Sequence, residues 1–198
     1  MSNLESHPFP PFYPEGARLL MMGTFPPQQA KWSMDFYYPN FINDMWRIFG
    51  LIFFNDSEFL VDKAHKTFHL ERIIALLKEK KIALNDTGVE VIRQKDNASD
   101  KFLQIEKPID ISNVLIKLPD CVAVATTGEK AAGVIVELTD SSLPKVGEHV
   151  NLDITLKDGS QRKIEHWRMP SSSRAYPLKL EKKAEYYRNM LKSLSILD

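Results

Sequence analysis

The sequence lacks the features that define several large classes of protein. Its 198 residues include a single cysteine, Cys121, so neither an internal disulfide nor a cluster of four thiolates can form. The surrounding stretch, DCVAVAT, indicates a small buried apolar residue. No apolar run approaches the 18 residues of a membrane-spanning helix, and the chain does not open with a signal peptide. We therefore expect a cytoplasmic protein that does not act at a membrane.

An excess of charge of one sign is also missing. The 26 Lys and Arg residues are matched by 26 Asp and Glu residues, so the formal net charge is zero. This balance argues against a strongly basic protein that coats nucleic acid by neutralising phosphates, although it leaves room for a local basic groove. The hydrophobic fraction of 43% is sufficient for a proper core. The length predicts one main domain, which we expect to be a monomer.

Three common catalytic and phosphate-binding motifs are absent. The chain contains no G-x-S-x-G turn of a hydrolase, no G-x-G-x-x-G and no G-x-x-x-x-G-K-[ST]. His65 and His69, four residues apart and close to Asp62, resemble part of a metal site. A third ligand is not evident in the sequence, so we expect neither a metal ion nor a cofactor.

The chain begins with a proline-rich segment. Residues 1–16, MSNLESHPFPPFYPEG, contain four prolines and three aromatic residues. Proline limits regular structure, so this segment is predicted to be an extended arm. A disordered tail is the alternative, although the aromatic side chains favour packing across the body of the protein. Residues 17–198 are expected to form a single α/β domain.

Strand patterns and helix patterns alternate along the rest of the chain. Short apolar runs predict strands at 17–22, 81–86 and 121–127. An alternating stretch at 150–167, with Asp158-Gly159 near its middle, predicts a β-hairpin. Helices are predicted at 43–54, 67–81, 110–120, 128–138 and 177–195. This order predicts a three-layer α/β/α sandwich with a central, mostly parallel sheet.

Several finer expectations accompany these elements. Asn43 stands at the start of the first helix, and Thr67 stands at the start of the second. The stretch KLEKKAEYYR at 179–188 mixes charges of both signs and is expected to form a solvated helix face. Residues 94–101 and 139–149 are expected to be polar connections.

Loops of small and polar residues follow four of the predicted strands. They are GTFPP at 23–27, NDTG at 85–88, TTGE at 126–129 and MPSSSR at 169–174. Because the carboxyl ends of parallel strands meet at one edge of a sheet, these loops are expected to form a single cleft. Their polar groups include no nucleophile paired with a base, whereas aromatic residues are frequent nearby. The cleft therefore favours a flat, polar ligand stacked on aromatic rings, with a phosphate bound near Arg174.

In their order along the chain, these motifs resemble those of the uracil-DNA glycosylase superfamily. The resemblance is greatest to the branch that contains mismatch-specific and hypoxanthine-DNA glycosylases. It rests on LLMMGTFP at 19–26, DFYYPNFINDMWRIFG at 35–50, IALNDTG at 82–88, VAVATTGEKAA at 122–132 and MPSSSRAY at 169–176. Together these stretches extend the resemblance over about residues 17–190.

The resemblance implies a monofunctional DNA glycosylase that acts in base excision repair. Its partner is expected to be DNA with a damaged or deaminated base, uracil or hypoxanthine. The resemblance makes Asn43 the expected catalytic residue. The flipped base is expected to contact residues of the early motifs, namely Gly23, Thr24, Phe25, Tyr38 and Asp86. The DNA phosphates are expected to contact the last motif through Ser171, Ser172, Ser173 and Arg174.

These residues also have ordinary structural interpretations. Asn43 is a favoured helix N-cap, and capping is compatible with catalysis. Phe25 stands where many relatives carry an Asp or Asn that positions water, so it either stacks on the base or belongs to the core. Arg174 either contacts phosphate or is a surface charge. The alternative function is a catalytically inactive relative that binds nucleic acid or a nucleotide, and an enzyme acting on free nucleosides is a weaker third interpretation.

Overall fold

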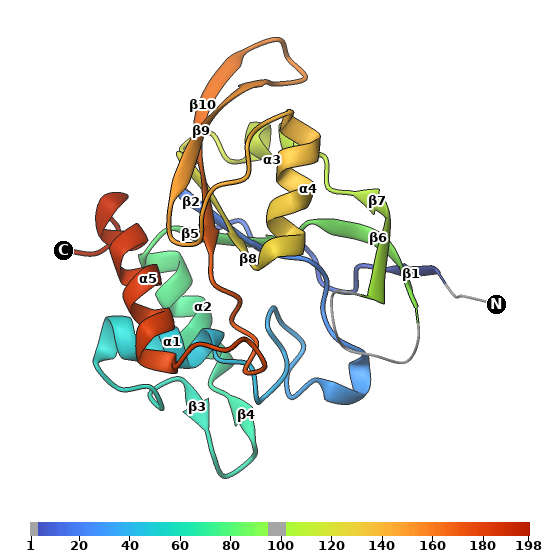
Figure 1. Ribbon diagram of the computed structural model, residues 1–198. Coiled ribbons are helices and arrows are strands. Elements are labelled where there is room, and N and C mark those ends of the chain that lie inside the picture. Colours follow the sequence, from blue (N-terminus) through green and yellow to red (C-terminus); the bar gives the residue numbers. More distant parts are fainter. Residues whose placement is uncertain (1–3, 95–101) are drawn as a thin grey trace.

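The computed structural model describes residues 4–94 and 102–198. At its centre lies a five-stranded sheet with the strand order β5-β2-β8-β10-β9 (Figure 1). These strands are β5 (Ile82–Asp86), β2 (Leu19–Gly23), β8 (Ala123–Thr127), β10 (Gln161–Met169) and β9 (His149–Thr155). The first four are parallel, and β9 pairs with β10 in the antiparallel direction. The mostly parallel sheet and the hairpin around Asp158-Gly159 are both confirmed.

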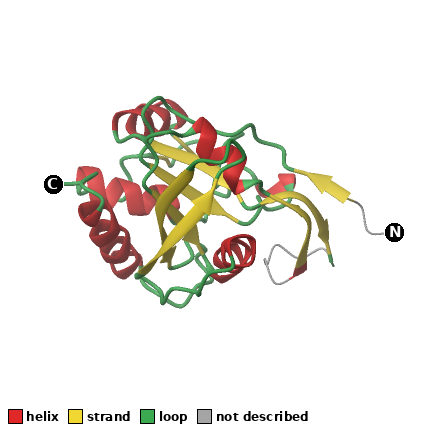
Figure 2. Cartoon of the chain, turned by 90° about the horizontal axis from the view of Figure 1, so that it is seen from above, coloured by secondary structure: helices red, strands yellow, loops and turns green. Residues whose placement is uncertain are grey.

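Helices cover both faces of this sheet, as Figure 1 and Figure 2 show. One layer contains α1 (Met45–Phe54), α2 (Leu70–Glu79) and α5 (Leu180–Ser193), and the other contains α3 (Ile111–Lys117) and α4 (Glu129–Thr139). Alternate side chains of β2 enter the two cores, with Leu19 and Met21 in one and Leu20 and Met22 in the other. Burial on both faces explains the continuous apolar run of this strand. The fold is the expected three-layer α/β/α sandwich.

A second, smaller sheet continues from the end of β5, and no pattern in the sequence predicted it. It contains β1 (Leu4–Ser6), β6 (Gly88–Arg93) and β7 (Leu103–Pro108) in the order β1-β6-β7, with antiparallel pairs. The proline-rich arm joins the fold through β1, and Phe12 forms a further bridge with Leu84 of β5. Residues 95–101, most of the predicted polar connection at 94–101, lie outside the described residues.

The predicted helix start at Thr67 is wrong. Thr67 belongs to β4 (Thr67–Phe68), which pairs with β3 (Val61–Asp62), and its hydroxyl donates to the carbonyl of Ser33. This hydrogen bond to a residue 34 positions earlier in the sequence holds the chain extended where the capping pattern predicted a helix. The helix α2 begins three residues later, after His69.

The predicted solvated face of α5 also needs correction. Lys183 lies within the stretch 179–188, yet its side chain is completely buried. It lies three residues after Leu180 and four before Tyr187, which places it on the apolar side of the helix. Its burial is tolerated because its ammonium group pairs with the carboxylate of Asp44.

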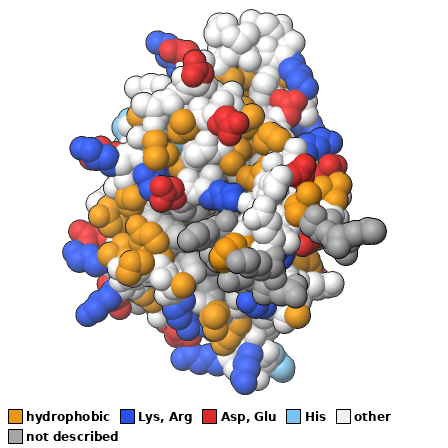
Figure 3. All heavy atoms as spheres, turned by 45° about the vertical axis from the view of Figure 1, so that its right-hand side comes forward, with side chains coloured by type: hydrophobic (Ala, Val, Ile, Leu, Met, Phe, Trp, Pro, Cys, Tyr) orange, Lys and Arg blue, Asp and Glu red, His pale blue; other side chains and the backbone are white. Residues whose placement is uncertain are grey.

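The surface and the single cysteine reflect the composition. Side chains of both charges are interspersed over the face drawn in Figure 3, in keeping with the zero net charge. Cys121 is buried, and burial raises the pKa of its thiol to about 11, so it behaves as the small apolar residue that the sequence indicated. Within residues 4–94 and 102–198, no helix has the length and apolar character needed to cross a membrane.

Candidate functional site

The loops that follow β2, β5, β8 and β10 meet at one edge of the sheet. The backbone N–H of Thr87, after β5, donates to the carbonyl of Gly23 at the end of β2 (2.9 Å). The N–H of Gly128, after β8, donates to the carbonyl of Met169 at the end of β10 (3.2 Å). Because β2 and β8 are neighbouring strands, these contacts bring all four loops to the same side of the protein. The convergence expected from a parallel sheet is therefore present.

The first two loops are joined through a buried carboxylate. Oδ1 of Asp86 accepts a hydrogen bond from the N–H of Gly23 at 3.0 Å. A Cβ atom at position 23 would lie only 2.9 Å from this oxygen, so a larger residue would displace the carboxylate. The adjacent Thr24 is also buried, and its carbonyl accepts the N–H of Gly88. Three of the predicted base-binding residues are thus held close together.

Tyr38 reaches the same edge from the loop that precedes α1. Its hydroxyl lies 3.2 Å from the hydroxyl of Thr127 at the end of β8. Its ring packs edge-on against Trp46 of α1, with ring centroids 5.9 Å apart. The backbone of Tyr38 has a φ of 53°, a left-handed conformation that bulky residues rarely adopt. Conformations of this kind persist where the surroundings impose them, and they are common at functional sites.

Asn43 lies two residues before α1, and the two ends of its amide have different surroundings. Oδ1 accepts the N–H of Met45, the first residue of α1, at 2.9 Å, whereas the N-cap of the helix is Asp44. Within the part of the chain that the structure describes, Nδ2 has no hydrogen-bond partner. The N-cap interpretation of Asn43 is therefore wrong by one residue, because Asp44 occupies that position. The bond to Met45 fixes the amide and leaves its amino group with two N–H donors for a ligand.

A buried ion pair connects the Asn43 loop to the serine-rich loop after β10. Nζ of Lys183 lies 2.9 Å from Oδ2 of Asp44 and 2.7 Å from the carbonyl oxygen of Ser173. Arg174 contacts the other carboxylate oxygen of Asp44 at 3.2 Å. The N–H of Asp44 donates to the carbonyl of Ser172 at 2.9 Å. The loop before α1, the loop after β10 and the helix α5 are thereby fixed relative to one another.

The residues of the predicted phosphate-binding segment differ in exposure. Ser173 and Arg174 are exposed, Ser171 is half-buried and Ser172 is buried. Ser172 therefore contributes to the fold through its backbone, while Arg174 keeps 52% of its side chain exposed despite its contact with Asp44. Because two cations share this one carboxylate, the group of Arg174, Lys183 and Asp44 has a formal excess of one positive charge.

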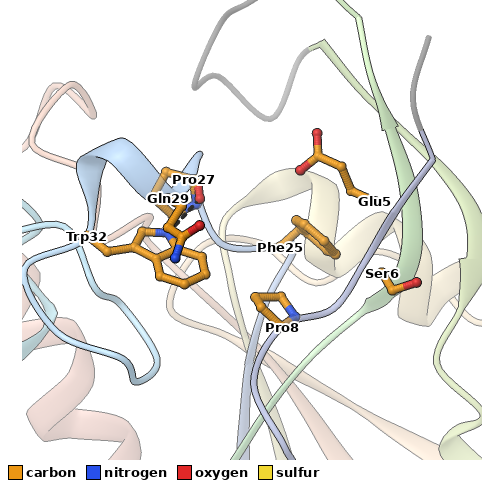
Figure 4. Close-up of a pocket in the computed structure, with 7 residues that line it drawn as sticks. All are labelled: Glu5, Ser6, Pro8, Phe25, Pro27, Gln29 and Trp32. Atoms are coloured by element: carbon orange, nitrogen blue, oxygen red, sulfur yellow. Dashed lines mark hydrogen bonds between the residues drawn. The ribbon is translucent and has the colours of Figure 1, made fainter.

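Phe25 is mostly a core residue. It is 9% exposed and packs in a small apolar cluster with Val91 and Leu103. Its ring also lines a hollow of about 280 Å³ between the proline-rich arm and the segment from Phe25 to Trp32 (Figure 4). The core interpretation of Phe25 is confirmed, and stacking of its ring on a base stays a prediction.

His7 also lies at this site, beside Asp86. Its Nε2 lies 2.9 Å from Oδ2 of Asp86, and only 10% of its side chain is exposed. Its ring stacks on that of Tyr37 and meets the ring of Phe25 edge-on. Burial, together with the nearby Asp86, raises the pKa of Tyr37, so this phenol stays protonated. The aromatic residues of the arm indicated packing, but no pattern distinguished its one histidine.

The two histidines of the candidate metal pair, His65 and His69, make separate contacts. Nδ1 of His65, in the turn between β3 and β4, lies 2.8 Å from Oδ2 of Asp62, and this hydrogen bond lowers the pKa of the carboxyl group. The N–H of His69 donates to the carbonyl of Leu60. Among the residues that the structure describes, no group of three or more His, Cys, Asp or Glu side chains could hold a metal ion.

Comparison with known proteins identifies the fold. No family model matches the sequence, and no curated protein matches it. Among solved structures, the chain is similar to the solution NMR structure of a "putative Uracil DNA glycosylase" from Methanosarcina acetivorans, with a TM-score of 0.60 and 19% sequence identity. The alignment covers 96% of this chain and 99% of that one, so the two proteins share the same overall α/β fold.

Proposed function

We propose that this protein is a DNA glycosylase that removes uracil or hypoxanthine by hydrolysing the N-glycosidic bond. The observation that carries the proposal is the meeting of Asp86, Tyr38 and the Asn43 loop at the carboxyl edge of a parallel sheet. Ligands of open α/β sheets bind at this edge. The sequence motifs and the fold shared with the similar structure also support the proposal.

Binding requires that the damaged nucleotide rotate out of the duplex toward the sheet edge. Tyr38 offers an aromatic ring on which the base can stack, a contact worth about 1–3 kcal/mol. The backbone N–H groups after Gly23 and the carboxylate of Asp86 provide polar groups for the edge of the base. Ser173 and Arg174 are exposed and are suited to hold the neighbouring phosphates.

The chemical step breaks the bond between C1′ of the sugar and the base nitrogen, and the electron pair leaves with the base. A water molecule adds to C1′ of the oxocarbenium-like sugar, and the proton that it releases neutralises the departing base. The free N–H groups of Asn43 would donate to the base as negative charge develops, and the hydrogen bond from Met45 already orients this amide. Loss of one such donor costs about 3 kcal/mol, or roughly a hundredfold in rate.

Single-turnover excision from synthetic duplexes that contain one uracil or one hypoxanthine tests the proposal. The wild-type protein should produce abasic sites in these duplexes and none in undamaged DNA. Asn43→Ala should slow excision by about a hundredfold, with a loss of stability of about 1 kcal/mol from the missing hydrogen bond to the N–H of Met45. Asn40→Ala is the matched control, because Oδ1 of Asn40 also accepts a backbone N–H, that of Ile42 at 3.1 Å.

Two outcomes would count against this account. Excision by Asn43→Ala within a few-fold of the wild-type rate would limit Asn43 to its structural hydrogen bond with Met45. A wild-type protein that excises neither base from any duplex is not a glycosylase of this class.

A catalytically inactive relative that binds nucleic acid or a nucleotide is the second candidate. It is favoured by the packing of Phe25, because an aromatic ring cannot act as a general base at this loop position. Such a protein would retain lesion duplexes in a binding assay without releasing a base. Release of uracil from free deoxyuridine alone would instead indicate an enzyme that acts on nucleosides.

A further inference from the structure

The four loops at the sheet edge supply few cations for a DNA partner. Within GTFPP, NDTG, TTGE and MPSSSR, Arg174 is the single Lys or Arg, and it already contacts Asp44. A duplex bound at this edge would cover a wide area, since even one small DNA-binding module buries about 600–1,000 Å² of protein surface. Because phosphate neutralisation supplies most of the sequence-independent affinity for DNA, further cations are expected on elements beside these loops.

The β3–β4 hairpin extends from the same end of the molecule. Figure 1 shows it at the lower end, below the loop that follows β10. Its strands have only two residues each, and the turn between them, residues 63–66, is exposed at every position. Lys or Arg side chains and a His gather at this lower end in the space-filling view (Figure 3). The turn therefore projects into solvent on the side of the protein that carries the candidate site.

The base of the hairpin is joined to the Asn43 loop. The ring of Phe68 in β4 packs against that of Phe41, with ring centroids 5.7 Å apart. The guanidinium group of Arg47 lies over both rings, 4.9 Å from the centroid of Phe41 and 5.6 Å from that of Phe68. It also donates to the carbonyl oxygens of Phe41 at 2.8 Å and Asn43 at 3.2 Å. Together with the hydrogen bond from β4 to the loop before α1, these contacts fix the hairpin relative to the candidate site.

The hairpin and its base carry more positive than negative charge. The cations are Lys63 and Lys66 in the turn and Arg47 at the base. The carboxylates are Glu58 and Asp62, so the group has a formal excess of one positive charge when its histidine is neutral. The side chain of Lys63 is 72% exposed and lies 3.5 Å from Glu58, a carboxylate that it shares with Arg47. Within the described ranges Lys66 forms no ion pair, so its ammonium group is open to a partner.

We propose that the β3–β4 hairpin binds the sugar–phosphate backbone of duplex DNA beside the damaged nucleotide, through the ammonium groups of Lys63 and Lys66. This inference rests on the proposed function, since it concerns the same DNA. A lysine contacts phosphate as a point charge and carries no information about sequence. The hairpin therefore sets the position of the duplex on the protein, while the loops at the sheet edge contact the lesion.

Salt titration of duplex binding tests the hairpin without relying on excision. Fluorescence anisotropy of a labelled, undamaged duplex would compare the wild-type protein with the Lys63→Gln, Lys66→Gln variant. The variant should lower the slope of log affinity against log salt by about two, since two phosphate contacts are lost, and should bind about tenfold or more weakly at roughly 0.1 M salt. The Lys63→Arg, Lys66→Arg variant retains both charges and should keep the wild-type slope. Because both lysines are exposed, these substitutions should leave folding intact.

The Lys157→Gln, Lys163→Gln variant is the matched control. Both lysines are exposed in the β9–β10 hairpin, which Figure 1 shows at the upper end of the molecule, opposite the β3–β4 hairpin. The control removes the same amount of charge from another hairpin, and it should leave the salt slope unchanged. An equal loss of slope in both variants would mean that only the net charge of the protein matters.

Shortened duplexes locate the contact along the DNA. The probe is a duplex with one tetrahydrofuran abasic site, a stable analogue of the expected product, and about one helical turn (roughly 10 base pairs) on each side of it. Because the hairpin lies to one side of the candidate site, removal of one flank should abolish the difference in affinity between the wild-type protein and Lys63→Gln, Lys66→Gln. Removal of the other flank should preserve it. A difference that survives the removal of either flank would contradict a contact with the flanking backbone.

The results separate this inference from the proposed function. An unchanged salt slope in Lys63→Gln, Lys66→Gln, an equal change in the control variant, or no duplex binding by the wild-type protein would each overturn the hairpin contact. A slope that depends on the hairpin, in a protein that excises neither base, would leave the contact standing and remove the enzymatic proposal. Excision of uracil by a protein whose salt slope ignores both lysines would support the enzyme and place its phosphate contacts elsewhere.

Discussion

Replacement of Lys183 by methionine tests how the candidate site is held together. The ammonium group of Lys183 is completely buried, with Oδ2 of Asp44 at 2.9 Å and the carbonyl oxygen of Ser173 at 2.7 Å. Methionine has a similar length but no charge. The substitution therefore leaves the carboxylate of Asp44, which is 9% exposed, without its buried partner.

The expected loss of stability follows from this burial. Removal of one member of a buried ion pair costs about 3–5 kcal/mol, because the other charge stays buried. Arg174 remains 3.2 Å from the other oxygen of Asp44, so the lower end of this range, about 3 kcal/mol, is expected for Lys183→Met. For a protein of this length, such a loss lowers the melting temperature by roughly 6–12 °C.

Urea unfolding followed by tryptophan fluorescence would measure this loss. Asp44→Asn and the double variant Asp44→Asn, Lys183→Met complete a double-mutant cycle. The double variant should be more stable than the sum of the two single losses predicts, because it buries no unpaired charge. Lys182→Met is the control, since this neighbouring lysine pairs with Glu185 on the surface and its loss should not move the urea midpoint. A cost below about 1 kcal/mol for Lys183→Met, or simple additivity in the cycle, would refute the reasoning.

Three further predictions concern single residues. Arg174→Ala should lower the slope of log affinity against log salt for duplex DNA by roughly one, since its half-exposed guanidinium group would neutralise one phosphate; an unchanged slope would assign phosphate binding elsewhere. Phe25→Ala should weaken capture of the flipped base by about 1–3 kcal/mol, whereas Phe25→Asn introduces an amide that can position water and should retain more excision. If neither substitution changes the single-turnover rate of excision, Phe25 acts only as a core residue. Burial lowers the pKa of His166 from 6.5 to about 4. Between these pH values the unfolded chain binds a proton at His166 that the folded chain does not bind. The free energy of unfolding should therefore fall by up to roughly 3 kcal/mol as the pH drops from 6.5 to 4. His166→Asn should flatten this dependence in urea titrations, and an equal slope in both proteins would contradict the assignment.

The architecture could be predicted because each main strand has a local signature. The run from Leu19 to Met22 is apolar at every position since it is buried on both faces, and Asp158-Gly159 marks the turn of the hairpin. The loops that follow parallel strands lie at one edge of the sheet. The convergence of Gly23, Asp86 and the serine-rich loop could therefore be predicted from the strand order, although no contact between them was known.

The contacts that complete the site could not be predicted in this way. His7 and Asp86 are 79 residues apart, and Asp44 and Lys183 are 139 apart, so no local pattern connects either pair. One signal was nevertheless available: Lys183 falls on the apolar stripe of its helix, next to Ala184 and four residues before Tyr187. A lysine at such a position requires a buried anion, and Asp44 provides it.

The separation of 139 residues between Asp44 and Lys183 has a consequence for biosynthesis. The loop that contains Asp44 leaves the ribosome early, whereas Lys183 is added 139 residues later. At ordinary rates of translation this interval is about 7–28 s, during which the carboxylate has no buried partner. Because the serine loop and α5 also emerge at the end, a nascent chain cannot assemble the two halves of the site before its synthesis is almost finished. An incomplete chain would accordingly be unable to hold the Asn43 loop in place, and the candidate site would be complete only once the last helix has been made.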